Sequence, residues 1–143
     1  MKFKFQFLSV ILSLIVLTGC ATGPSFQEQS ASIPTASPDS ARIYVYRTAV
    51  LGAAIQPAVK VNDEIVGKAV PKGFFYIDRP AGNYTISAST EAKRNLTIAL
   101  EPGDERYVRL EVKIGLLVAQ VKPVLVENSI GQQQIAGTKY VGQ

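Results

Sequence analysis

The chain has 143 residues, with 15 basic against 11 acidic side chains and a hydrophobic fraction of 47%, which indicates one folded domain rather than a disordered chain. Histidine and tryptophan are absent, and cysteine occurs once. These absences exclude an intramolecular disulfide, a zinc site built from Cys and His, and a Ser-His-Asp or Cys-His catalytic unit.

The first segment, 1–19, has the pattern of an export signal. Lys2 and Lys4 precede an almost wholly apolar run at 7–17. A basic start followed by a run of this length is typical of a secretory signal peptide, and the run is shorter than the 20 or so residues that span a membrane.

The signal ends at the single cysteine. Residues 17–20 read Leu-Thr-Gly-Cys and resemble the lipobox of bacterial lipoproteins, in which a peptidase cuts before a cysteine that carries diacylglycerol. We therefore expect Cys20 to be lipidated through a thioether and to carry acyl chains such as palmitate. Two or more chains give stable membrane anchoring. The alternative, that Cys20 is an ordinary residue of an uncleaved anchor, is disfavoured because the basic, apolar and cysteine segments all agree.

The residue after the cysteine indicates which membrane the lipoprotein reaches. An aspartate there resembles an inner-membrane retention signal, and this chain has Ala21 instead. We expect a lipid-anchored protein of the cell envelope, in the outer membrane facing the periplasm if the source is Gram-negative. Without Lys2 and Lys4 the 15 basic side chains fall to 13 against 11 acidic ones, so the charge predicts no nucleic-acid partner.

A tether is predicted at 20–40. The segment is rich in Ser, Ala, Thr and Pro, and its sizeable apolar side chains are Phe26 and Ile33. Such a composition buries too little apolar surface to become ordered on its own. As a flexible coil of 20 residues it would span about 25 Å.

The region 41–127 is predicted to be all β. β-branched and aromatic residues alternate with polar ones between turn signals, and the alternation is clearest at 107–114, which predicts a half-buried antiparallel strand. Asn62-Asp63 and Pro102-Gly103 suit tight turns. The expected strands lie at 42–47, 58–61, 65–69, 73–78, 84–88, 96–100, 107–114 and 121–126.

Seven to eight short strands favour an antiparallel β-sandwich of immunoglobulin-like or prealbumin-like type. The segment 128–143 is predicted to be a polar C-terminal tail with at most one helical turn, at 129–135.

Several stretches together resemble a known family. They are 42–47, 59–63, 73–84, 107–109 and 115–118, and they resemble bacterial lipoproteins of domain-of-unknown-function family 2846 over roughly 41–127. The resemblance implies a β-sandwich-like fold and an envelope location. It implies no established activity, so it assigns no catalytic residue.

Two acidic pairs, Asp63-Glu64 and Asp104-Glu105, are the candidates for acid–base chemistry or calcium binding. Both fall at predicted turn tips, where acidic residues are common for conformational reasons. The two carboxylates of a glycosidase would have to face each other across a substrate. Neither loop has the closely spaced oxygen ligands that calcium needs. We therefore predict no catalytic residue, no cofactor and no metal site.

The aromatic residues of two strands are candidates for a core or for a binding surface. Tyr44 and Tyr46 share one strand face, and Phe74 and Tyr76 share another. We expect them to fill a core with sheets on both sides. The alternative is an exposed aromatic strip that binds a glycan or a protein.

The apolar run at Leu116, Leu117 and Val118 is either a strand bend that is covered on both faces or an exposed patch that contacts a partner. The favoured function is a membrane-anchored, non-enzymatic envelope lipoprotein that acts as a binding or accessory module. Its expected partners are the membrane, through the lipid on Cys20, and another envelope protein or a glycan. The alternative is an enzyme or enzyme subunit that acts on cell-wall material with carboxylates only.

Overall fold

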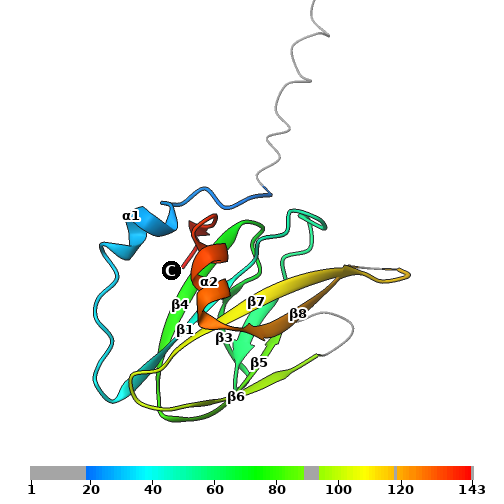
Figure 1. Cartoon of the computed structure of the whole chain (residues 1–143). Helices are drawn as coiled ribbons and strands as arrows, with labels where there is room; N and C mark the ends of the chain where they lie inside the picture. Colours follow the sequence, from blue (N-terminus) through cyan, green and yellow to red (C-terminus); the bar gives the residue numbers. More distant parts are fainter. Residues whose placement is uncertain (1–18, 89–93, 118, 143) are drawn as a thin grey trace, which may run out of the picture.

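The computed structural model describes residues 19–88, 94–117 and 119–142, so most of the predicted signal, 1–18, and Val118 lie outside the described residues. Two β-sheets form a sandwich, and two short helices lie on one side of it (Figure 1). The elements in chain order are α1 (Phe26–Ser30), β1 (Ser40–Tyr46), β2 (Ala58–Val61), β3 (Glu64–Lys68), β4 (Gly73–Pro80), β5 (Gly82–Ala88), β6 (Leu96–Leu100), β7 (Glu105–Ile114), β8 (Ala119–Val126), α2 (Asn128–Ile135) and β9 (Lys139–Tyr140).

The predicted all-β sandwich is confirmed, and each of the eight expected strands is present with small changes in its bounds. One sheet has the order β8-β7-β1-β4-β9 and the other has the order β3-β2-β5-β6. The sandwich is not purely antiparallel, because β1 runs parallel to β7 and β4 runs parallel to β9. The expectation for 107–114 is therefore wrong on one edge, since β7 is antiparallel to β8 only.

The parallel pairing follows from where the chain changes sheets. The short turns after β4 and after β6 do not join neighbouring strands. Instead, each carries the chain from one sheet to the other, so β4 and β5 do not pair and neither do β6 and β7. Strand β7 consequently enters beside β1 from the same end as β1, and the amide of Arg42 donates to the carbonyl of Asp104 at 2.8 Å.

Both predicted turn signals have the expected backbone conformation. Asn62 and Asp63 have φ values of 47° and 68°, which is the left-handed pair that a two-residue hairpin between β2 and β3 requires. Gly103 has a φ of 84°, and the amide of Asp104 donates to the carbonyl of Glu101 at 3.1 Å. This is the geometry expected for Pro-Gly at the centre of a type II turn.

The main core lies between the two sheets. Alternate residues of each strand point into it, as the period-two pattern predicts. Its fully buried members include Ile43 and Val45 of β1, Val59 of β2, Ile86 of β5 and Val108 of β7.

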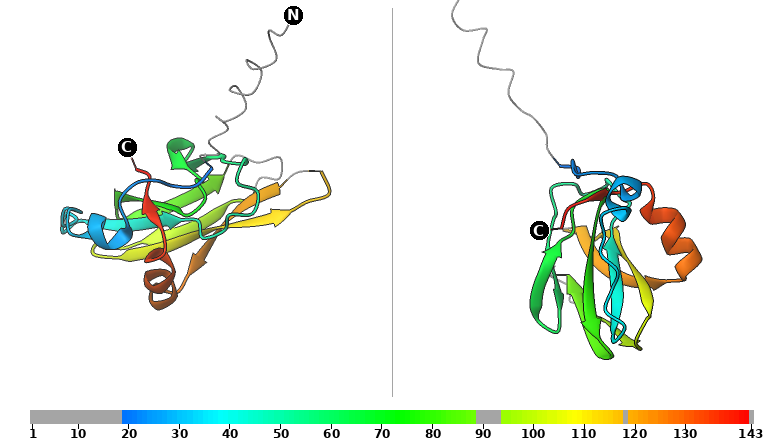
Figure 2. Two further views of the ribbon diagram at one scale, coloured as in Figure 1. Left: turned by 90° about the horizontal axis from the view of Figure 1, so that it is seen from above. Right: turned by 90° about the vertical axis from the view of Figure 1, so that its left-hand side faces the viewer.

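A second, aromatic cluster covers the outer face of the five-stranded sheet. Tyr44 and Tyr107 stack with their ring centroids 5.0 Å apart, and Tyr46, Phe74 and Ile135 are buried beside them. Burial raises the pKa of Tyr107 to about 12. The expectation that these aromatics belong to a core is confirmed for Tyr44, Tyr46 and Phe74, and Tyr76 is partly buried beside them, but the expectation of sheets on both sides is wrong. The cover is helix α2 and the N-terminal segment rather than a third sheet (Figure 2).

The segment 20–40, expected to be a flexible tether, instead packs on this aromatic surface. Ser25 and Glu28 form a capping box at the start of α1, which satisfies the free amides of the first turn. The Phe26 ring lies edge-on to Phe74 with the centroids 5.2 Å apart, and the Phe26 amide donates to the carbonyl of Thr138. The segment needs no core of its own, because its few apolar side chains enter a surface that the strands have already built.

The tail at 128–143 is also more structured than expected. The single predicted helical turn is confirmed and extended to a helix, α2, with Ile135 fully buried. Gly131 lies directly against Tyr107, so a side chain at this position has no room. Strand β9 then joins the edge of the five-stranded sheet beside β4.

Removing the ring of Phe26 tests whether the N-terminal segment is docked. We expect Phe26→Ala to lower the free energy of unfolding by about 2 kcal/mol, because it removes a partly buried aromatic ring from the cluster. Gln27→Ala, at an exposed neighbouring position, is expected to change it by less than about 0.5 kcal/mol. Urea denaturation of both variants measures this, and equal stability of the two would show that the segment is a free tether.

Candidate functional site

Cys20 lies on the surface of the domain, held by its neighbours on both sides. Its side chain is exposed. The carbonyl of Gly19 accepts a hydrogen bond from Nε2 of Gln56 at 3.0 Å, and the amide of Ala21 donates to the carbonyl of Pro71 at 2.9 Å. The predicted lipidation site is therefore clamped between two loops, without the spacer that a 20-residue tether would give.

One of these loops, 48–57, is organised by the buried side chain of Arg47. The guanidinium is inaccessible to solvent, and its five N–H donors all go to backbone carbonyl oxygens. Nε donates to Ala49 at 3.1 Å. Nη1 donates to Ile55 and Ala69 at 2.7 Å each, and Nη2 donates to Leu51 and Gly52 at 2.8 and 3.0 Å.

This arrangement uses the full donor capacity of an arginine. A buried charge is tolerated only when its hydrogen bonds are made, so the loop must keep its carbonyls turned inward. Burial lowers the pKa of the Arg47 guanidinium from its ordinary value, and nearby Cys20 acts in the opposite direction. The side chain remains a cation at neutral pH.

The inward carbonyls leave apolar side chains of the same loop facing outward. Val50 is 47% exposed, Leu51 57% and Ile55 36%. The loop also touches the base of the β7–β8 hairpin, since Gly52 packs closely against Ala119 and Val112.

The tip of the β7–β8 hairpin is the most exposed apolar part of the described chain. Leu116 is 99% exposed, Leu117 87% and Ile114 70%. Of the two readings of this run, the structure has the exposed patch for Leu116 and Leu117, while Val118 lies outside the described residues. Whether the patch contacts a partner stays a prediction.

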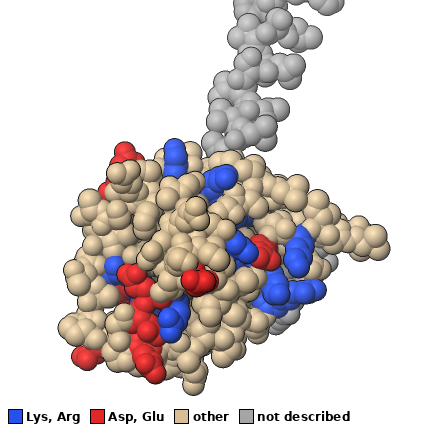
Figure 3. Space-filling model, in the orientation of Figure 1, with Lys and Arg blue, Asp and Glu red and all other residues tan. Residues whose placement is uncertain are grey.

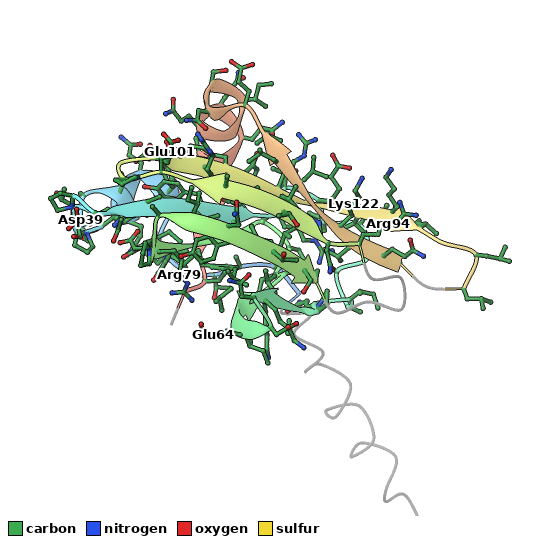
Figure 4. The ribbon with its side chains drawn as sticks, turned by 90° about the horizontal axis from the view of Figure 1, so that it is seen from below. Asp39, Glu64, Arg79, Arg94, Glu101 and Lys122 are labelled. Atoms are coloured by element: carbon green, nitrogen blue, oxygen red, sulfur yellow. The ribbon has the colours of Figure 1, made fainter. Side chains whose placement is uncertain are left out.

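Charged side chains of both signs occur at both ends of the sandwich, several of them in ion pairs such as Arg106–Asp104 and Arg109–Glu111. Figure 4 shows Asp39 and Glu101 at one end, and Lys122 and Arg94 towards the end that carries the hairpin tip. The space-filling view shows most acidic side chains at the lower left and several basic ones on the right, with some side chains of the other sign on each side (Figure 3). Lys113, next to Ile114, is exposed.

The two acidic pairs lie at turns, as their sequence context indicates, and the structure does not bring them together. Glu64 at the β2–β3 turn forms an ion pair with Arg79 at 3.0 Å. Asp104 pairs with Arg106 at 2.8 Å and accepts from the amide of Glu101. Among the described residues, no group of three or more acidic or cysteine side chains is placed to hold a metal ion.

A shallow groove of about 430 Å³ lies where the N-terminal segment crosses β1 and the start of β7. Arg42 at its wall forms a two-pronged ion pair with Asp78, with both contacts at 2.7 Å, and donates to the carbonyl of Pro34. Its guanidinium also lies 4.7 Å from the centroid of the Tyr76 ring. The contacts with Asp78 hold Arg42 against β4, and the hydrogen bond to Pro34 fastens the N-terminal segment, so Arg42 is a structural residue.

No helix within the described ranges is long and apolar enough to cross a membrane. The residues that sequence reasoning missed are Arg47 and the outward side chains Val50 and Leu51. Only the position of Arg47 at the end of a buried strand, ahead of a loop poor in charge, hints at its role. Period-two analysis of 42–47 does not identify a buried cation.

The family described as "Protein of unknown function (DUF2846)" matches residues 37–124 of the chain. A protein of Haemophilus influenzae described as an uncharacterized protein is 29% identical over 140 residues, which cover 94% of this chain and 83% of that relative. No solved structure matches the chain at a significant level.

Replacing Arg47 by lysine tests the role of its five hydrogen bonds. A lysine has three donors, so at least two of the five carbonyls lose their partner, and we expect Arg47→Lys to lower the free energy of unfolding by about 2–4 kcal/mol. Arg79→Lys, which alters an exposed ion pair, is expected to cost less than about 1 kcal/mol. Chemical denaturation of both variants measures the difference, and an Arg47→Lys protein as stable as its control would contradict this role.

Proposed function

The chain belongs to the family described as "Protein of unknown function (DUF2846)", and from that premise we propose that it is a membrane-anchored lipoprotein of the bacterial envelope, acting as a non-enzymatic binding or accessory module. The observation that carries the proposal is Cys20. It follows a basic and apolar export segment, and its side chain is exposed at the surface of the folded domain.

The position of Cys20 suits an acyl anchor. The hydrogen bonds at Gly19 and Ala21 involve the backbone, so they remain available when the sulfur is alkylated. A new amino terminus at Cys20 would retain the Ala21 contact and would end the chain beside loop 48–57. The anchor would then join the membrane to the domain with hardly any intervening chain.

Ion pairing of the candidate acidic residues supports a binding role rather than catalysis. The carboxylates of Glu64 and Asp104 are engaged in ion pairs at turns. The exposed apolar hairpin tip is the feature available to bind a partner. Ala21 after the cysteine supports an outer-membrane location facing the periplasm in a cell with two membranes. The ligand of the module is expected to be another envelope component, a protein or a glycan.

Metabolic labelling of Cys20→Ser tests the anchor. The wild-type protein is expected to incorporate labelled palmitate, and Cys20→Ser is expected to incorporate none and to remain as an unprocessed precursor. Serine keeps the size and polarity of the side chain but lacks the thiol that accepts the lipid. Thr22→Ser, at an exposed position two residues further on, serves as the control and should label like the wild type. Equal label in wild type and Cys20→Ser, or no label in the wild type, would overturn the proposal.

A further inference from the structure

We propose that loop 48–57 and the β7–β8 hairpin tip form a second membrane contact that inserts into the interface of the leaflet that holds the acyl chains of Cys20. We call this surface the apolar edge and define it by five side chains: Val50, Leu51, Ile114, Leu116 and Leu117. The inference rests on the proposed function, because it takes the lipid on Cys20 as the first anchor.

The apolar edge is poorly suited to water. Its side chains are between 47% and 99% exposed. A cluster of large, exposed apolar side chains is unusual on a protein surface that contacts no partner. The side chains of Val50 and Leu51 are kept outward by the loop conformation, since Arg47 holds the carbonyls of Ala49, Leu51, Gly52 and Ile55. The acyl region of a bilayer accepts such side chains without requiring any polar partner.

The apolar edge is continuous with the anchoring point. After cleavage before Cys20, the amide of Ala21 still donates to the carbonyl of Pro71 at 2.9 Å, and the amide of Ala69 donates to the carbonyl of Pro57 at the end of the loop at 3.0 Å. Gly52 of the same loop packs against Ala119 and Val112 at the base of the hairpin. Figure 1 shows the start of the N-terminal segment and the loop at the top of the sandwich, and the hairpin tip projecting to the right. A bilayer that holds the lipid of Cys20 therefore meets the loop and the tip as well.

The charges favour the same orientation. Lys113 is adjacent to Ile114, and Lys122 and Arg94 lie towards the hairpin end, while Asp39 and Glu101 lie at the opposite end (Figure 4). Anionic headgroups attract basic side chains that flank inserted apolar ones, and they repel acidic ones. The end that carries Asp39 and Glu101 is thereby kept away from the membrane.

A bilayer fits this surface better than a protein partner does. The tip presents two leucines at the narrow end of a hairpin, whereas a stable protein interface needs roughly 800 Å² from each partner. The first anchor also keeps the apolar edge close to lipid, so that even a weak second contact is occupied most of the time.

Tryptophan fluorescence in vesicles tests the proposal, because the natural chain has no tryptophan. The reporter Leu117→Trp is placed in the acylated protein, reconstituted in vesicles of phosphatidylethanolamine and phosphatidylglycerol with bromine on part of the acyl chains. We expect its emission to shift to the blue and to be quenched by the brominated lipid. Leu51→Trp should behave in the same way.

The matched control is Leu125→Trp. Leu125 is a 42% exposed leucine of β8 and lies roughly 20 Å along that strand from Ala119. It should show neither the shift nor the quenching. Equal quenching at Leu117 and Leu125, or no quenching at Leu117 while the acylated protein is on the vesicles, would overturn the inference. A blue-shifted emission of the Leu117→Trp variant in native membranes, without quenching in the brominated vesicles, would also overturn the inference, in favour of a protein partner.

A failure of acylation at Cys20 can be distinguished from a failure of the apolar edge to insert. Palmitate label on the same preparation reports whether Cys20 is acylated, and its absence counts against the proposed function. The double variant Cys20→Ser with Leu117→Trp, produced from residue 20 onward and mixed with the same vesicles at high lipid concentration, then reports insertion of the tip without the acyl anchor or the export segment. Blue-shifted, quenched emission there would support the apolar edge, and unchanged emission would count against it.

Discussion

The buried guanidinium of Arg47 is the interaction on which the organisation of the end that carries Cys20 depends. Taking a guanidinium out of water is unfavourable unless each of its donors finds an acceptor. Arg47 meets this condition with five carbonyl oxygens, four of loop 48–57 and one of Ala69. The loop conformation is thus fixed from inside. Gln56 of this loop and Pro71, just beyond Ala69, then hold the backbone on either side of Cys20.

The aromatic cluster provides the surface on which the N-terminal segment packs. Strands β1, β4 and β7 contribute Tyr44, Phe74 and Tyr107 to the outer face of their sheet, and Phe26 closes the cluster from the N-terminal side. Arg42, paired with Asp78, fastens the same segment further along. The two ends of the segment are therefore tied to opposite ends of the sheet, so a force or a tilt at Cys20 is transmitted to the sandwich directly.

Much of the fold follows from local patterns in the sequence. The alternation at 107–114 and the turn residues Asn62, Asp63 and Gly103 specify backbone conformations that any tertiary context would have to respect. The pairing of β1 with β7 could not be predicted, because a turn such as 101–104 has the same sequence signal whether it joins neighbours or changes sheets. The docking of Phe26 was missed because composition measures what a segment can bury alone, while its partner surface is built by distant strands. The same holds for the candidate site: Cys20 and the leucines at 116 and 117 are visible in the sequence, but the five acceptors of Arg47 come together only in the folded chain.

Hydrogen exchange followed by mass spectrometry tests the central claim most directly, that one end of the sandwich faces the bilayer. The acylated protein in vesicles is compared with the Cys20→Ser variant, produced from residue 20 onward, in solution. We expect slower amide exchange on the vesicles in peptides that cover 49–57 and 113–120, because lipid excludes water from these loops. The turn at 101–104 should exchange at the same rate in both samples. Protection of 101–104 in place of the two loops, or identical exchange everywhere, would contradict the account.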